Sequence, residues 1–172
     1  MEKVDLDFHA ISSSTAKLYA YRISLGDSPQ SPFKRLYRVP VPRDVDLVLL
    51  EEVLSMFKGT HDFRSFAGQM EQKEKASGGK VSTVRTVHDV RVVREGDGDI
   101  MFLFLLEGAL YKMVRNMCGT ALACARGEIE LETVKDLLEG GWAGRKDNKS
   151  KPAKPEGLTL EKVWFDNCWQ DF

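Results

Sequence analysis

The sequence predicts an α+β fold, in which a mainly antiparallel sheet carries two or three helices packed on one side. Alternating residues around a glycine-rich turn in 84–106 indicate paired strands. Apolar residues spaced three and four apart in 44–58, 109–126 and 131–139 indicate helices. The length of 172 residues fits a single domain, residues 1–172, with enough chain to bury a sizeable core.

The first predicted strand covers 15–24. Tyr19, Tyr21 and Ile23 recur at every second position, so they share one face of that strand. The next segment, 26–43, contains one glycine and four prolines, and it is expected to form a loop.

A helix is expected after this loop, beginning at Asp44 or Asp46, because an aspartate side chain accepts hydrogen bonds from the free amides of a first turn. Gly59 is expected to end it. The segment 67–82 is charged and contains Ser-Gly-Gly, which predicts a mobile loop. The apolar face of the helix consists of Leu47, Leu50, Leu54 and Phe57.

The clearest strand pattern is a β-hairpin. Residues 84–93 alternate and are rich in valine, Gly96-Asp97-Gly98 supplies a turn, and 99–106 forms the returning strand. The returning strand is apolar at both odd and even positions from Ile100 to Leu106. It is therefore expected in the middle of the sheet, covered on both faces.

Two helices and a last strand complete the predicted order. The first helix spans about 109–126, and the second spans about 131–139 and ends at Gly140-Gly141. Residues 142–156 are expected to form a basic loop. The last strand is predicted from its apolar residues, which are Leu158, Leu160 and Trp164.

The charge is balanced overall but not locally. Lys and Arg total 25 and Asp and Glu total 26, which excludes a uniformly basic nucleic-acid-binding protein. Segment 11–43 nevertheless has six basic residues and one acidic residue, and segment 145–155 has five and one. Such blocks are often only solvated loops, but two basic loops also suit a protein with one RNA-facing side.

Several kinds of site find no support in the sequence. The three cysteines lack a C-x-x-C spacing and the three histidines are far apart, so neither a zinc site nor a disulfide framework is indicated. Cys118 and Cys124 are expected to be core residues. Asp62 is expected to bond backbone amides. No apolar run is long enough for a membrane helix, and the expected location is intracellular, first the cytoplasm, with nucleus or organelle left open.

Four stretches of the sequence occur in an order that points to a family. They are Phe8-His9-Ala10 with Ser12-Ser13-Ser14-Thr15 and Tyr19-Ala20-Tyr21, Gly59-Thr60-His61-Asp62-Phe63-Arg64-Ser65-Phe66, Met113-Val114-Arg115-Asn116 with Gly119, and Pro152-Ala153 with Glu156-Gly157-Leu158-Thr159-Leu160 and Val163. At these separations they resemble the TruA-type tRNA pseudouridine synthases, over about Asp7 to Phe165.

The resemblance implies isomerisation of uridine to pseudouridine in the anticodon arm of tRNA, with no cofactor and no metal. It covers only the C-terminal part of such an enzyme. The family's Gly-Arg-Thr-Asp segment, whose aspartate is the nucleophile, lies upstream and is not in this sequence. Residues 1–172 are therefore expected to be a C-terminal fragment that is inactive alone. The expected partner is tRNA, and a homodimer is possible.

The resemblance also implies roles for individual residues. Arg115 matches the arginine that pairs with the catalytic aspartate, Tyr19 the tyrosine that stacks on the target uracil, and Leu158 the apolar wall of the base pocket. Their ordinary structural roles would be a solvent-facing arginine, a core tyrosine and a core leucine. The candidate RNA contacts are Lys17, Lys34, Arg35, Arg38, Arg145, Lys146, Lys149 and Lys151.

Two alternatives remain open at this stage. The chain could be a non-catalytic RNA-binding or dimerisation module, or a domain unrelated to RNA in which the motifs are fortuitous. In the second case Arg115 and Tyr19 would lie far apart rather than facing one cleft.

Overall fold

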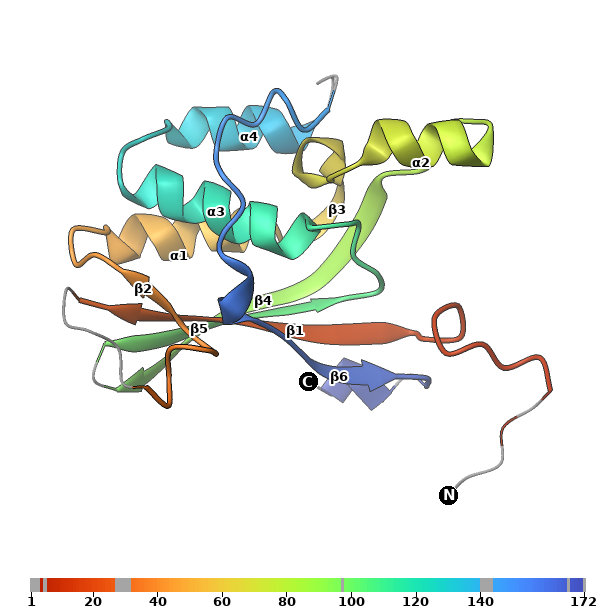
Figure 1. Ribbon diagram of the computed structural model, residues 1–172, viewed down its shortest axis with the longest axis horizontal. Coiled ribbons are helices and arrows are strands. Elements are labelled where there is room, and N and C mark those ends of the chain that lie inside the picture. Colours follow the sequence, from red (N-terminus) through yellow and green to blue (C-terminus); the bar gives the residue numbers. More distant parts are fainter. Residues whose placement is uncertain are drawn as a thin grey trace.

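The computed structural model describes residues 4, 6–26, 32–96, 98–139, 144–166 and 168–171. These residues form one mixed sheet with the helices on one side of it, which confirms the predicted α+β class (Figure 1). The strands are β1 (Ala16–Leu25), β2 (Val39–Val41), β3 (Gly59–Asp62), β4 (Val84–Gly96), β5 (Asp99–Leu106) and β6 (Leu158–Trp164). The helices are α1 (Leu47–Met56), α2 (Met70–Ser77), α3 (Met113–Ala125) and α4 (Leu131–Glu139), with short 3-10 turns at Phe63–Phe66, Pro155–Gly157 and Cys168–Asp171.

The sheet has the order β2-β1-β5-β4-β3, and β6 pairs with β1. Among the described strands, β1 and β2 are parallel and the other pairs are antiparallel. The apolar strand β5 lies between β1 and β4, as predicted from its composition. Its two faces pack in separate clusters, with Phe102 and Phe104 on the helix side and Leu103 and Leu105 on the other. The predicted hairpin and last strand are thus confirmed, although Asp97 of the turn is outside the described residues.

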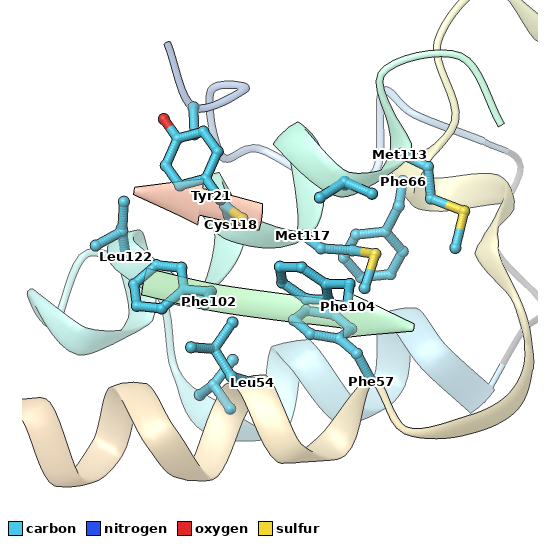
Figure 2. Close-up of a cluster of buried hydrophobic side chains, with 14 of the residues drawn as sticks. Tyr21, Leu54, Phe57, Phe66, Phe102, Phe104, Met113, Met117, Cys118 and Leu122 are labelled. Carbon is cyan, nitrogen blue, oxygen red and sulfur yellow. The ribbon is translucent and has the colours of Figure 1, made fainter. Parts of the chain in front are cut away.

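The main core fills the space between the sheet and the helices. Figure 2 shows the rings of Phe102 and Phe104 among side chains from α1 and α3. Cys118 and Cys124 are buried there, as predicted, and burial raises the pKa of the Cys118 thiol well above its usual value. No helix in the described part of the chain is long and apolar enough to cross a membrane.

Helix α1 begins where an aspartate cap predicted it. The Asp46 carboxylate accepts hydrogen bonds from the amides of Val48 and Leu49, at 2.9 and 3.0 Å. The prediction that Gly59 ends this helix is wrong. The helix closes at Phe57, whose backbone N–H donates a hydrogen bond to the carbonyl of Leu54. Gly59 instead starts β3, with a φ of 117°.

Helix α2 replaces the loop expected in 67–82. Its residues, Met70–Ser77, include several good helix formers. The left-handed residue Gly78 closes the helix, and its backbone N–H donates a hydrogen bond to the carbonyl of Glu74. Arg64 anchors it through two hydrogen bonds to Glu74, at 2.9 and 3.0 Å. Local propensity and this tertiary ion pair therefore outweigh the loop-like charge pattern.

Two other boundaries differ from the sequence prediction. Strand β2 lies within the expected loop 26–43, because Val39 and Val41 are buried beside β1 while Pro40 sits exposed on an edge strand. Helix α3 starts at Met113 rather than near 109. The predicted helix end at Gly140-Gly141 lies outside the described residues, as do the first two residues of the basic loop 142–156.

Candidate functional site

An extended segment crosses α3 on its way to β6. We call residues 148–154 the strap; it lies in the blue segment that passes over α3 in Figure 1. The amide of Ala153 donates to the carbonyl of Arg115 at 2.9 Å, and Arg115 Nε donates to the carbonyl of Ala153 at 2.8 Å. The strap is therefore bonded to both the backbone and the side chain of Arg115.

The strap lies directly on the backbone of α3 at Gly119. A Cβ atom at this position would stand 2.0 Å from the carbonyl oxygen of Lys151 and 2.9 Å from the amide nitrogen of Ala153. Both of these atoms belong to the backbone, so neither can rotate away. The close approach of strap and helix therefore requires glycine at position 119.

Arg115 is a partly buried cation in the first turn of α3. Its Nε is held by Ala153, which fixes the guanidinium plane. The two terminal amino groups of the guanidinium take no part in this hydrogen bond, so they can bind a second partner. No carboxylate among the described residues forms an ion pair with it. A planar guanidinium held in this way is suited to bidentate binding of a carboxylate or phosphate.

Tyr21 links the strap to strand β1 of the sheet. It is fully buried, and its hydroxyl donates to the carbonyl of Lys154 at 2.8 Å. Burial raises the pKa of Tyr21, as does the nearby Cys118, whereas the positive charge of Arg115 acts in the opposite direction. The strap connects the two side chains, because Tyr21 bonds to Lys154 and Arg115 to the adjoining Ala153.

Tyr19 and Leu158 lie on the same, helix-facing side of the sheet as Tyr21. Tyr19 is two residues away along β1, and Leu158 is the direct cross-strand neighbour of Tyr21 in β6. Both are partly buried and pack against the main core, and burial raises the pKa of Tyr19. Tyr19 and Leu158 therefore lie on the sheet face that packs against the main core and the helices (Figure 1).

A comparison with known families identifies the family of this chain. A family model described as tRNA pseudouridine synthase matches residues 53–166. The chain belongs to this family.

Three relatives in the tRNA pseudouridine synthase family illustrate the coverage. The tRNA pseudouridine synthase A of Streptococcus agalactiae is 31% identical over 176 residues, covering 100% of this chain and 64% of the relative. The corresponding protein of Anoxybacillus flavithermus is 35% identical, covering 96% and 62%. The tRNA pseudouridine synthase A 2 of Clostridium perfringens is 34% identical, covering 95% and 62%. The chain therefore spans less than two thirds of the length of these relatives.

Two aspartates of this synthase-family chain bind residues other than Arg115. Asp62 accepts from the amide of Arg64 at 3.0 Å and from the hydroxyl of Thr83, which is the backbone-bonding role predicted for it. Asp89 lies on β4 and pairs with Lys58 and Arg91, at 2.9 and 2.6 Å. Burial would raise the pKa of Asp89, but these hydrogen bonds outweigh it and lower that pKa.

Three of the predicted RNA-contacting residues form ion pairs or hydrogen bonds within the protein. Lys34 pairs with Asp99 at 2.8 Å, and Arg38 pairs with Glu95 at 2.5 Å and with Asp99 at 3.6 Å. Arg145 donates to the carbonyls of Asn148 and Ser150 inside its own loop. The other predicted contacts form no ion pair with a described residue; they are Lys17, Arg35, Lys146, Lys149 and Lys151.

The sequence analysis missed the residues that hold the strap in place. Thr120, Asn148 and Ser150 are buried polar residues that bond to one another between α3 and the strap. Beside them is a cleft of about 550 Å³, whose lining includes the strap, β2 and the C-terminal half of α3. The alternation Asn148-Lys149-Ser150-Lys151 could have signalled this arrangement, because it is a period-two pattern with one buried face.

Within the described part of the chain, no group of three or more His, Cys, Asp or Glu residues could hold a metal ion. The groups that the site does offer are a guanidinium, a phenol and an apolar wall, with exposed lysines on the strap. This set can bind an anion next to a flat, uncharged ring.

Proposed function

We propose that this chain is part of an enzyme that converts uridine to pseudouridine in the anticodon arm of tRNA. The observation that carries the proposal is Arg115, a fixed, partly buried cation that pairs with no described carboxylate. Its position in the Met113-Val114-Arg115-Asn116 motif supports the same role.

The partner of Arg115 is the nucleophilic aspartate of the family's Gly-Arg-Thr-Asp segment, supplied by polypeptide outside residues 1–172. A bidentate ion pair orients such a carboxylate and lowers its pKa, so it stays ionised near neutral pH. In the reaction the glycosidic bond to N1 breaks, the uracil turns in place, and a new bond forms between C5 and the ribose. The proton on C5 is released as N1 gains one, so the overall change is an isomerisation.

Tyr19 and Leu158 form the pocket for the target base. The base must leave its helix to be reached, and a phenol ring provides a stacking platform worth about 1–3 kcal/mol. Leu158, on the neighbouring strand β6, supplies the apolar wall of this pocket. Both side chains are partly buried on the helix side of the sheet, which suits a water-poor site for a detached uracil.

RNA affinity comes from exposed cations around this site. Lys149 and Lys151 on the strap are exposed, together with Lys146 in the preceding loop and Arg35 near β2, while Lys17 of β1 is partly exposed. Lys34 and Arg38 contribute only if their ion pairs with Asp99 and Glu95 open. The tRNA could span two copies of the enzyme, and light scattering of the enzyme with and without tRNA tests that arrangement.

Tritium release measures the reaction directly, since a tritium label on uracil C5 is lost to water when pseudouridine forms. An enzyme containing this chain is expected to release tritium from labelled tRNA, and Arg115→Lys is expected to slow release about 100-fold or more. Arg94→Lys is the matched control, because Arg94 is exposed and paired with Glu51 on α1. Binding of tRNA without any release would instead favour the alternative of a non-catalytic RNA-binding module.

A further inference from the structure

Beneath the strap lies a closed ring of polar contacts, formed by Thr120 of α3 with Asn148 and Ser150 of the strap. Asn148 Nδ2 donates to Thr120 Oγ1 at 2.9 Å, the hydroxyls of Thr120 and Ser150 are 2.7 Å apart, and Ser150 Oγ donates to Asn148 Oδ1 at 2.7 Å. The hydroxyl of Thr120 also lies 2.8 Å from the carbonyl of Asn116. We call these three residues the polar ring.

The polar ring is buried between α3 and the strap. Thr120, Asn148 and Ser150 are 0%, 3% and 7% exposed, so their hydrogen-bonding groups depend on one another. A satisfied polar network in such surroundings favours one arrangement over all others, because every alternative leaves a buried group unpaired. Arg145 adds to this from outside by donating to the carbonyls of Asn148 and Ser150.

The ring fixes the register of the strap relative to α3. Ser150 is three residues before Ala153, and Thr120 is five residues after Arg115, so the ring and the Arg115–Ala153 contact join the same two segments. Between them, the backbone of the strap lies against Gly119. A shift of the strap at the ring would therefore move the carbonyl of Ala153 away from Arg115 Nε.

We propose that the polar ring, with Arg145, is a positioning device for Arg115: it sets the strap so that Ala153 holds the guanidinium in the plane that its carboxylate partner requires. This inference rests on the proposed function of Arg115. It gives Arg145 a role in shaping the site instead of the phosphate contact expected from the sequence.

The test follows the Nε–H proton of Arg115 by NMR in the 172-residue chain. Thr120→Val and Ser150→Ala each break the ring, and either change is expected to speed exchange of this proton with water about tenfold, as loss of one hydrogen bond implies. Amide signals of β4 and β5 should stay unchanged. Thr120→Ser keeps the hydroxyl and should restore slow exchange, and Thr133→Val on α4 is the matched control.

Unchanged exchange of the Arg115 proton in folded Thr120→Val or Ser150→Ala protein overturns the proposal. Global unfolding in both variants also overturns it, since the ring would then serve the whole fold rather than Arg115. This readout needs neither RNA nor nucleophile. A positive NMR result with no tritium release from the enzyme would therefore refute the proposed function separately from the positioning role.

Discussion

Arg115 and Ala153 are joined by two hydrogen bonds in opposite directions, one from the strap to the helix backbone and one from the guanidinium to the strap. The pair ties residue 115 of α3 to a segment that leads directly into β6 and Leu158. It converts a flexible arginine on a helix into a fixed cation over the sheet.

Replacing Arg115 should affect activity more than stability. Arg115→Lys keeps a positive charge but loses the planar fork and the Nε bond to Ala153, so it should lower kcat by about 100-fold or more in an enzyme that contains this chain. Steady-state tritium release measures this. An Arg115→Lys enzyme that retains near-normal kcat would contradict the assigned role, and Arg94→Lys should behave like the unsubstituted protein.

Gly119→Ala should destabilise the fold. A methyl group there overlaps the carbonyl of Lys151, and forced repacking of this kind costs about 1–3 kcal/mol or more. Urea unfolding of the 172-residue chain gives the free energy of unfolding. Gly108→Ala is the control, because a Cβ at Gly108 meets no atom within 4 Å and should change stability little.

Tyr21→Phe should weaken the link between the strap and β1. It removes the hydroxyl that donates to Lys154 and should lower the free energy of unfolding by about 0.5–1.5 kcal/mol. Tyr37→Phe, at an exposed position, should have no measurable effect. Equal stability of the Tyr21→Phe and unsubstituted proteins would mean that this hydrogen bond does not hold the strap.

Acid should weaken the region where β1, β2 and the β4–β5 turn meet. Burial raises the pKa of Asp99, but hydrogen bonds from Lys34 and Ser24 and the charge of Arg38 outweigh it, so the folded pKa lies below the ordinary value of 3.8. A lowered folded pKa stabilises the fold above the unfolded pKa, and that stability is lost as the pH falls through the folded value. With Asp99→Asn, the free energy of unfolding should therefore fall less steeply as the pH drops below 3.8. Urea unfolding at successive pH values measures this. An unchanged pH profile would contradict the ion-pair role.

The 172-residue chain should bind tRNA weakly, without sequence preference, and less tightly as salt rises. Replacing both Lys149 and Lys151 by Gln should reduce the slope of log affinity against log salt by about 2, one for each lost phosphate contact. Fluorescence anisotropy with labelled tRNA measures the slope. Lys73→Gln with Lys75→Gln on α2 is the control pair, and no association at low salt would refute the prediction.

Local patterns predicted the parts of the fold that depend on neighbouring residues. The Asp46 cap and the apolar strand β5 are examples, since each is specified within a few positions. Strand β2 could not be predicted in the same way, because three residues become a strand only when β1 lies beside them. Helix α2 was missed because its charged residues read as a solvated loop, while the Arg64–Glu74 contact that anchors it spans ten positions.

The candidate site shows the same division. The motifs predicted Arg115, Tyr19 and Leu158 as site residues. The structure places Tyr19 and Leu158 on the helix-facing side of the sheet, next to Tyr21. The positive charge of Arg115 acts to lower the pKa of Tyr21. The polar ring was not predicted because Asn and Ser in a lysine-rich segment are usually exposed, although residues 148–151 alternate with a period of two. Only the packing of the strap on Gly119 buries them.

In the proposed enzyme, Arg115 pairs with a carboxylate supplied from outside residues 1–172. The most direct test of this ion pair measures tritium release from tRNA labelled at uracil C5. It compares this chain alone with the same chain extended at its N-terminus. The extension is the upstream segment of the Anoxybacillus flavithermus relative, which is 35% identical where the two align. We predict no release by the chain alone, release by the extended protein, and none after Arg115→Ala. Release by the 172-residue chain alone, or an extended Arg115→Ala protein as active as its parent, would contradict the account.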